Sequence, residues 1–170
     1  MLRLLLIRHA EAVAQDKSCD HERPLTPRGC WDAARLGAFC QQSGLFPEYA
    51  FVSPARRALD TLRFLTGELR RPVPFETDEL LYCASVFELC EVLERAPPGI
   101  ETLLIVGHNP GLAEFANFLL DGNVPLPHFP APCLALIRLS LEDWREVGAR
   151  RGELVHFANF SSMPAGEWPS

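Results

Sequence analysis

The sequence predicts an α/β protein: a three-layer sandwich in which a mostly parallel central sheet is flanked by helices on both faces. Short apolar runs alternate along the chain with segments of helical periodicity, and this alternation is typical of parallel sheets covered by crossover helices. The two clearest runs, Leu4–Ile7 and Thr102–Val106, end abruptly beside polar residues. A chain of 170 residues is most simply one domain with a substantial core.

Six segments are expected to be strands because each is a short run rich in aliphatic residues. The first run is followed directly by Arg8 and His9, and the fourth is followed by Gly107 and His108. The third run is the weakest of the six. The predicted strands are Leu4–Ile7, Tyr49–Val52, Pro72–Phe75, Thr102–Val106, Leu134–Leu139 and Leu154–Phe160.

Four helices are expected between these strands. Thr26 and Pro27 form a helix start, with threonine as N-cap and proline at the first helical position, and Gly44 ends that helix. The second helix carries leucines at every third position, which gives it an apolar stripe. The third begins at Ser85. The predicted helices cover residues 27–43, 55–66, 85–96 and 112–120.

The chain is expected to form a single domain over residues 1–160. The polar connection 15–27 is longer than most connections in compact domains, and such loops tend to be functional. The proline-rich segment 124–132 is expected to be a loop within the domain, because a strand pattern resumes after it. Residues 161–170 are expected to form a flexible C-terminal tail.

The charge balance narrows the classes of partner. The chain has 16 Lys and Arg against 22 Asp and Glu, a formal net charge of −6, which argues against nucleic-acid binding. Local arginines can nevertheless bind an anionic substrate. No apolar run approaches the ~20 residues that span a bilayer, and the first run is too short for a signal peptide. We therefore expect no membrane partner and a cytoplasmic location.

The cysteines are expected to be reduced, small apolar core residues. None forms a C-x-x-C pair, which argues against a zinc ribbon or a thioredoxin-like site. No cysteine has an arginine six positions later, so the nucleophile loop of cysteine-based phosphatases is absent. The six are Cys19, Cys30, Cys40, Cys83, Cys90 and Cys133.

Three polar segments are expected to meet at one edge of the sheet, because parallel strands share a C-terminal edge. They are Arg8-His9, Ser53–Arg57 and Gly107–Asn109. Arginine offers a planar fork of donors that matches phosphoryl oxygens, and histidine can attack phosphorus. Helix N-termini after two of the strands would add backbone donors. The sequence therefore predicts a phosphate site at this edge.

Other kinds of site fit these residues less well. His9 and His108 lack a carboxylate at metal-site spacing, and neighbouring arginines oppose a cation, so we expect no metal. Ser53 is followed by proline, and the chain has neither a G-x-S-x-G elbow nor a Walker-type phosphate loop. A histidine after a strand usually only caps it, but two at equivalent positions with matching arginines favour a functional site.

These segments resemble the signature of the histidine phosphatase superfamily, also called phosphoglycerate mutase-like. The first is similar to an R-H-G-x motif, with Ala10 in place of the usual glycine. The others resemble R-P-L-T-x-x-G, S-P-x-x-R-A-x-x-T and the second-histidine element. The four motifs occur in the order and at the spacing that are specific to this superfamily. The short chain, which has no helical insertion, most resembles SixA-type phosphohistidine phosphatases. The matching segments are Arg8–Glu11, Arg23–Gly29, Ser53–Thr61 and Gly107–Pro110.

The resemblance implies a role for each matching residue. His9 would be the nucleophile that forms a phosphohistidine intermediate. Arg8 and Arg57 would bind the phosphoryl oxygens, and His108 would be the second catalytic histidine. Arg23, from the long loop, would be a further phosphate ligand.

The proton donor and the remaining ligand are also implied by the resemblance. Glu79 lies after the third strand, where larger members place their general acid, and Asp78 and Glu11 are the alternatives. Asn109, next to the second histidine, is expected to bind substrate together with Arg23. No cofactor is expected.

The predicted function is therefore that of a metal-independent phosphatase that acts through a phosphohistidine intermediate. A SixA-type activity on a phosphohistidine-bearing protein is the first hypothesis. A small-molecule phosphomonoesterase or mutase on the same fold is the second. The third is a protein that binds a phosphorylated ligand without turning it over.

Overall fold

A six-stranded sheet forms the centre of the molecule, with strand order β3-β2-β4-β1-β5-β6. In this computed structural model the described residues are 1–15, 19–120, 126 and 129–161. Strand β1 pairs in parallel with β4, as β4 does with β2 and β2 with β3, whereas β5 is antiparallel to both β1 and β6. The strands are β1 (Leu2–Arg8), β2 (Tyr49–Val52), β3 (Phe75–Thr77), β4 (Thr102–Gly107), β5 (Cys133–Leu139) and β6 (Gly152–Asn159).

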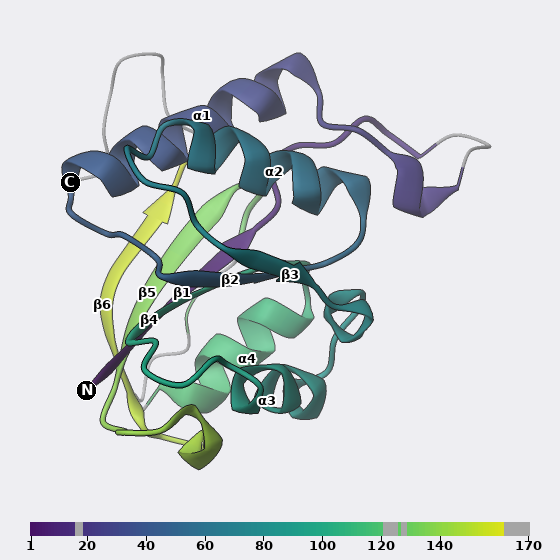
Figure 1. Cartoon of the computed structure of the whole chain (residues 1–170). Coiled ribbons are helices and arrows are strands. Elements are labelled where there is room, and N and C mark those ends of the chain that lie inside the picture. The colour runs from purple at the N-terminus through teal and green to yellow at the C-terminus, as the bar shows by residue number, and fades with distance from the viewer. Residues whose placement is uncertain (16–18, 121–125, 127–128, 162–170) are drawn as a thin grey trace.

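Helices cover both faces of this sheet, which confirms the predicted three-layer architecture. Figure 1 shows α1 and α2 on one face and α3 and α4 on the other. The four helices are α1 (Pro27–Gln42), α2 (Arg56–Gly67), α3 (Val86–Glu94) and α4 (Gly111–Leu119). The described part of the chain also has three short 3-10 turns between these elements: η1 (Asp20–Glu22), η2 (Glu79–Leu81) and η3 (Trp144–Glu146).

The apolar run of β1 lies between two cores. Leu4 and Leu6 pack into the core beneath α3 and α4, and Leu5 and Ile7 pack into the core beneath α1 and α2. All four are at most 1% exposed. A strand buried on both faces reads as a continuous apolar run, because successive side chains point to opposite faces.

The predicted helix starts form as expected. The Thr26 side chain accepts a hydrogen bond from the Gly29 amide and caps α1, with proline at its first position. A Cβ at Gly29 would lie 2.1 Å from the Glu11 carbonyl oxygen, so only glycine allows α1 to begin against the segment after β1. At α3, Ser85 and Glu88 form a capping box.

The third and last strands differ from the prediction. Strand β3 begins at Phe75 rather than at Pro72, because Pro72 and Pro74 have no amide to donate to the sheet. Pro74 contributes only its carbonyl, which accepts the Ala50 amide at 3.0 Å. Strand β6 begins at Gly152, two residues before the predicted start.

The prediction that all cysteines belong to the core is wrong for two of them. All six are free thiols, and Cys40 and Cys133 are buried. Cys19 and Cys83 are exposed, because each lies in a connection outside the strands and longer helices.

Parts of three predicted loops lie outside the described residues. They are residues 16–18 of the polar connection, residues 121–125 and 127–128 around the proline-rich segment, and residues 162–170 of the tail. Across the described part of the chain, no helix combines the length and the apolar character needed to cross a membrane.

Candidate active site

The pairing of β1 with β4 brings the two predicted catalytic histidines together. Arg8 is the register partner of Gly107, so His9 and His108 follow adjacent strands at the same level. The His9 amide donates to the Gly107 carbonyl at 3.1 Å, which extends the pairing by one residue. The imidazole ring centroids are 5.0 Å apart. Two residues 99 positions apart in sequence therefore share one site, as the strand pattern predicts.

The His9 ring is held by its own neighbour. Its Nδ1 lies 2.7 Å from the Ala10 carbonyl oxygen, which can only accept, so Nδ1 carries the proton. Nε2 is then the unprotonated nitrogen, and it accepts a longer hydrogen bond from Arg57 Nε at 3.3 Å. Thr61 fixes the backbone here, because its hydroxyl accepts the Ala10 amide at 2.9 Å. The lone pair of a nucleophilic imidazole is thus on Nε2.

The His108 ring has the opposite tautomer. Its Nδ1 lies 3.4 Å from Arg57 Nη2, and a guanidinium offers only donors, so Nδ1 must be unprotonated. Nε2 carries the proton and donates it to Ser53 Oγ at 2.7 Å. Ser53 is fully buried at the end of β2. Both histidines therefore direct an unprotonated nitrogen at the same guanidinium.

Burial keeps both imidazoles neutral. Desolvation lowers the pKa of His9 to about 4, against an opposing contribution from the Ala10 carbonyl, and the charge of Arg57 lowers it further. Desolvation is also the main reason that the pKa of His108 is lowered to about 3, and the charges of nearby His9 and Arg57 lower it further. A neutral histidine near pH 7 retains the lone pair that nucleophilic attack requires.

Arg57 lies in the first turn of α2 and is itself buried. Its Nε and Nη2 contact the two histidines, while Nη1 donates to the Asp20 carbonyl at 2.8 Å and Nη2 donates to Asp20 Oδ2 at 3.0 Å. Its backbone carbonyl accepts the Thr61 hydroxyl at 2.7 Å. One guanidinium therefore links β1, β4 and the polar connection after β1.

Arg8 and Asn109 share an anchor in the loop before β5. Arg8 Nη1 donates to the Phe129 carbonyl at 2.7 Å, and Asn109 Nδ2 donates to the same oxygen at 2.8 Å. Among the described residues, Arg8 Nε and Asn109 Oδ1 are buried without a hydrogen-bond partner. Buried polar groups are normally paired, and Arg8 Nε is a donor of the kind an anion can use, whereas Asn109 Oδ1 can only accept a hydrogen bond. Burial also lowers the pKa of Arg8.

Arg23 reaches the site through Asp20. Its Nε donates to Asp20 Oδ1 at 2.8 Å, and its Nη1 donates to the Val13 carbonyl at 3.0 Å. Its charge contributes to the lowered pKa of His9. Arg56, one residue before Arg57, is exposed and pairs with Asp60 at 3.6 Å, as expected for a side chain that points outward.

The three candidate proton donors have different surroundings. The buried Asp78 carboxylate caps η2 at the Leu80 amide and pairs with Arg95, which is a structural role. Glu11 accepts the Thr26 hydroxyl at 2.7 Å, beside the start of α1. The Glu79 side chain is exposed and makes no hydrogen bond or ion pair with any described residue. Of the three, Glu79 alone is unengaged.

The structure adds three residues to whose side chains the sequence prediction assigned no role. Ser53 and Thr61 occur in a matched segment, yet only the folded chain shows that they hold His108 and the strand end after His9. Asp20 belongs to the polar connection, and its contacts with Arg23 and Arg57 depend on how that connection folds back. The only signal in the sequence is its position three residues before Arg23.

Known proteins resemble this chain in sequence and in fold. The sequence model of the histidine phosphatase superfamily (branch 1) matches residues 4–82, which include His9 and Arg57. An uncharacterized protein of Mycobacterium tuberculosis is 31% identical over 159 residues, covering 89% of this chain and 98% of that protein. The chain belongs to the histidine phosphatase superfamily.

Within the superfamily, SixA proteins are similar over most of their length. Phosphohistidine phosphatase SixA of Escherichia coli is 28% identical over 140 residues, which cover 81% of this chain and 86% of that protein. The solved structure of a Nakamurella SixA protein superposes with a TM-score of 0.83 at 25% identity, covering 93% and 95% of the two chains. The superfamily fold thus extends beyond the matched residues 4–82 and includes β4, which precedes His108.

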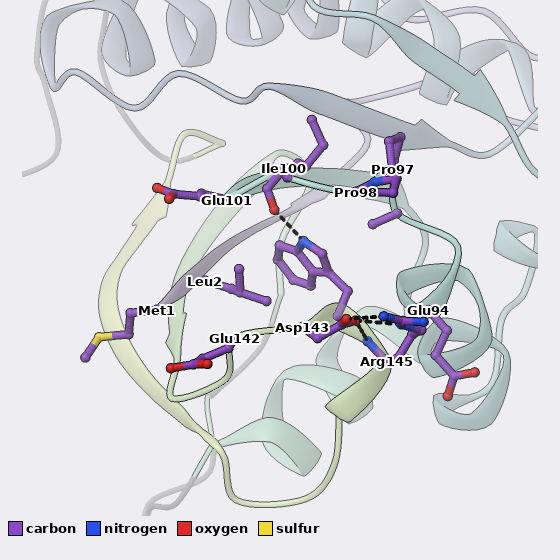
Figure 2. Close-up of a pocket in the computed structure, with 13 residues that line it drawn as sticks. Met1, Leu2, Glu94, Pro97, Pro98, Ile100, Glu101, Glu142, Asp143 and Arg145 are labelled. Carbon is purple, nitrogen blue, oxygen red and sulfur yellow. Dashed lines mark hydrogen bonds and ion pairs between the residues drawn. The ribbon is translucent and has the colours of Figure 1, made fainter.

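A separate hollow lies at the opposite end of the sheet. It measures about 590 Å³ and is lined by residues at the start of β1, before β4 and around η3 (Figure 2). Within it the Trp144 indole donates a hydrogen bond to the Ile100 carbonyl at 2.7 Å. None of its lining residues is a histidine. This hollow is therefore distinct from the histidine site.

Proposed function

We propose that this protein is a metal-independent phosphatase in which His9 is the nucleophile. The observation that supports this most strongly is the state of His9. Its Nδ1 proton is held by the Ala10 carbonyl, and its unprotonated Nε2 faces the buried guanidinium of Arg57. A phosphoryl group bound by Arg57 would place its phosphorus next to that lone pair. Arginines fixed in this way supply the positioning and charge stabilisation on which phosphoryl transfer depends.

The first step forms a bond between His9 Nε2 and phosphorus while the bond from phosphorus to the leaving group breaks. The electron pair of that bond departs with the leaving group, which takes up a proton from solvent. The Ala10 carbonyl accepts a hydrogen bond from Nδ1–H throughout, so it stabilises the positive charge that develops on the ring. Arg57 and Arg8 are the donors expected to bind the phosphoryl oxygens.

In the second step, water attacks phosphorus and the bond between phosphorus and His9 Nε2 breaks. Nε2 regains its lone pair, and the proton lost by water passes to phosphate or solvent. Splitting the hydrolysis in this way replaces one difficult displacement with two easier ones. His108, also neutral and 5.0 Å away between ring centroids, is the group expected to contact the phosphoryl oxygens from β4.

The substrate we propose is a phosphohistidine side chain of a protein. The similarity to SixA proteins supports this proposal. The surroundings of the three candidate proton donors also support it. An alkoxide leaving group needs a committed proton donor, but Asp78 and Glu11 are engaged elsewhere and Glu79 is exposed. A leaving imidazole depends less on such a donor, because its bond to phosphorus is already labile.

A turnover assay with several substrates tests this proposal. We expect the protein to release phosphate from a phosphohistidine-bearing protein faster than from small phosphate esters, and EDTA to leave the rate unchanged. Faster hydrolysis of small esters would favour a small-molecule phosphomonoesterase. Binding of inorganic phosphate with no turnover on any substrate would favour a ligand-binding protein, and loss of activity with EDTA would contradict the metal-free mechanism.

A further inference from the structure

Asp20 is the acidic residue most tightly connected to the histidine site. Its carboxylate accepts hydrogen bonds from Arg23 Nε at 2.8 Å, from Arg57 Nη2 at 3.0 Å and from the Tyr82 hydroxyl at 2.5 Å. Its backbone carbonyl accepts a fourth, from Arg57 Nη1. A carboxylate in a phosphate site calls for an explanation, because it repels the anion that the site must bind.

The two edges of the Arg57 guanidinium have different partners. The end-on edge, formed by Nη1 and Nη2, is taken by Asp20 through two hydrogen bonds of 2.8 and 3.0 Å. The side-on edge, formed by Nε and Nη2, faces the two histidine lone pairs at 3.3 and 3.4 Å. The short bonds hold the arginine, and the long ones are the contacts that phosphoryl oxygens can replace.

Asp20 is itself anchored on the far side. The Tyr82 ring lies edge-on to His108, with centroids 5.5 Å apart, and packs against His21 in a tilted arrangement with centroids 4.0 Å apart. The pKa of Asp20 is lowered to about 2, mainly by the hydrogen bond from Tyr82 and to a smaller extent by the hydrogen bond and charge of Arg57. The carboxylate is thus charged throughout the working pH range, although its side chain is 25% exposed.

We infer that Asp20 is a positioning residue for the phosphatase reaction, which acts by fixing Arg57 through its end-on edge. This rests on the proposed function. The carboxylate orients the side-on edge toward His9 and His108, and its other oxygen ties Arg23 to the same place. The hydrogen bond from the Tyr82 hydroxyl holds the Asp20 carboxylate in this orientation. The contrary role, an internal anion that competes with substrate for Arg57, predicts that tungstate affinity and kcat/KM of Asp20→Asn rise rather than fall.

The test compares Asp20→Asn with the parent in two measurements. One is calorimetric binding of tungstate, a tetrahedral oxyanion that mimics phosphate, and the other is steady-state kinetics. Asparagine keeps the shape but loses the charge and can offer an oxygen to only one arginine. We expect tungstate affinity and kcat/KM each to fall about 10- to 100-fold, because that is the usual effect of losing one charge-assisted hydrogen bond. The thermal midpoint should stay within a few degrees of the parent. Asp20→Glu should recover part of the loss, and Tyr82→Phe should reproduce a smaller part of it.

Asp60→Asn is the matched control. Asp60 also pairs with an arginine of α2 and is 24% exposed, but it has no contact with the histidines. This variant should bind tungstate and turn over like the parent. Tungstate affinity of Asp20→Asn equal to or above that of the parent would overturn the inference. A parent that neither binds tungstate nor releases phosphate would instead overturn the proposed function, which separates the two failures.

Discussion

The two ends of the central sheet differ in what they offer a ligand. The amino end of β1 and β4 has a hollow of about 590 Å³, in which Trp144 donates to the Ile100 carbonyl and Arg145 pairs with Asp143. The carboxyl end has two imidazole lone pairs directed at one buried guanidinium, beside the buried Nε of Arg8, which has no partner among the described residues. The ends are roughly 20 Å apart along a seven-residue strand.

Under the proposed function, the end of the sheet that acts on substrate is the one with the reactive side chains, not the one with the open hollow. At the amino end, Trp144 is 5% exposed and fills space beneath the loop after α3, so the residues there mainly stabilise the fold. At the carboxyl end, burial makes both histidines neutral and leaves arginine donors available for an anion. Substitutions at the two ends should therefore separate catalysis from stability.

The largest expected effect is at the carboxyl end. His9→Ala removes the proposed nucleophile, so kcat/KM should fall by at least about 10⁴-fold, as in other enzymes that lose their nucleophile. Steady-state phosphate release measures this directly. Activity of the variant within a few-fold of the parent would mean that another group attacks phosphorus.

A smaller loss of catalytic activity is expected for Ser53→Ala. The variant leaves the buried Nε2–H of His108 without its acceptor, which costs about 1–3 kcal/mol and frees the ring to adopt the other tautomer. We expect kcat/KM to fall about tenfold. Imidazole ¹⁵N shifts should show a single His108 tautomer in the parent and a mixture in Ser53→Ala. An unchanged tautomer with unchanged kcat/KM would exclude a positioning role for Ser53.

The lowered histidine pKa values also predict how stability depends on pH. In the unfolded chain a histidine binds a proton below about pH 6.5, whereas folded His9 does so only near 4. The unfolded state therefore holds more protons between these values, and the free energy of unfolding falls as the pH is lowered. His9 alone should account for about 2 kcal/mol between about pH 7.5 and 5.

Urea unfolding of the parent and of His9→Gln over this range isolates that contribution. Glutamine does not titrate, so the variant should show a pH dependence that is shallower by about this amount. Parallel curves for the two proteins would show that His9 is not held neutral in the folded state.

The smallest catalytic effect is expected at the amino end. Trp144→Ala should lower the free energy of unfolding by about 3–5 kcal/mol, because it removes a large buried side chain and its hydrogen bond. Glu142→Gln, also in the hollow, should leave both stability and activity near those of the parent. Below the unfolding transition, kcat/KM of both variants should match the parent within about twofold. A selective loss of activity in either would show that the hollow contributes to catalysis.

The sequence predicted the fold and the meeting of the histidines because both depend on regular pattern. A parallel sheet brings residues after its strands to one edge, so the positions of His9 and His108 follow from two apolar runs and their order. Arg57 follows from the same rule, because it lies in the first turn of the helix after β2. These predictions needed no information about loops.

What the sequence could not predict depends on loop conformation and on proton positions. Asp20 and Phe129 reach the site from connections between the strands and the longer helices, and the path of such connections leaves no periodic signal in the sequence. The tautomers of the two histidines depend on single acceptors, the Ala10 carbonyl and Ser53 Oγ, which only three-dimensional distances reveal. The third strand was misplaced because the loss of two proline donors outweighed the apolar pattern.

Rapid quenching of the parent during turnover tests the central claim most directly, since the claim is that His9 carries the phosphoryl group. Mass spectrometry of the quenched protein should find a phosphoryl group on His9 that is lost in acid and survives in alkali. His9→Ala should show none under the same conditions. A phosphoryl group on another residue, or turnover by the parent with no phosphoenzyme at any time after mixing, would contradict the account.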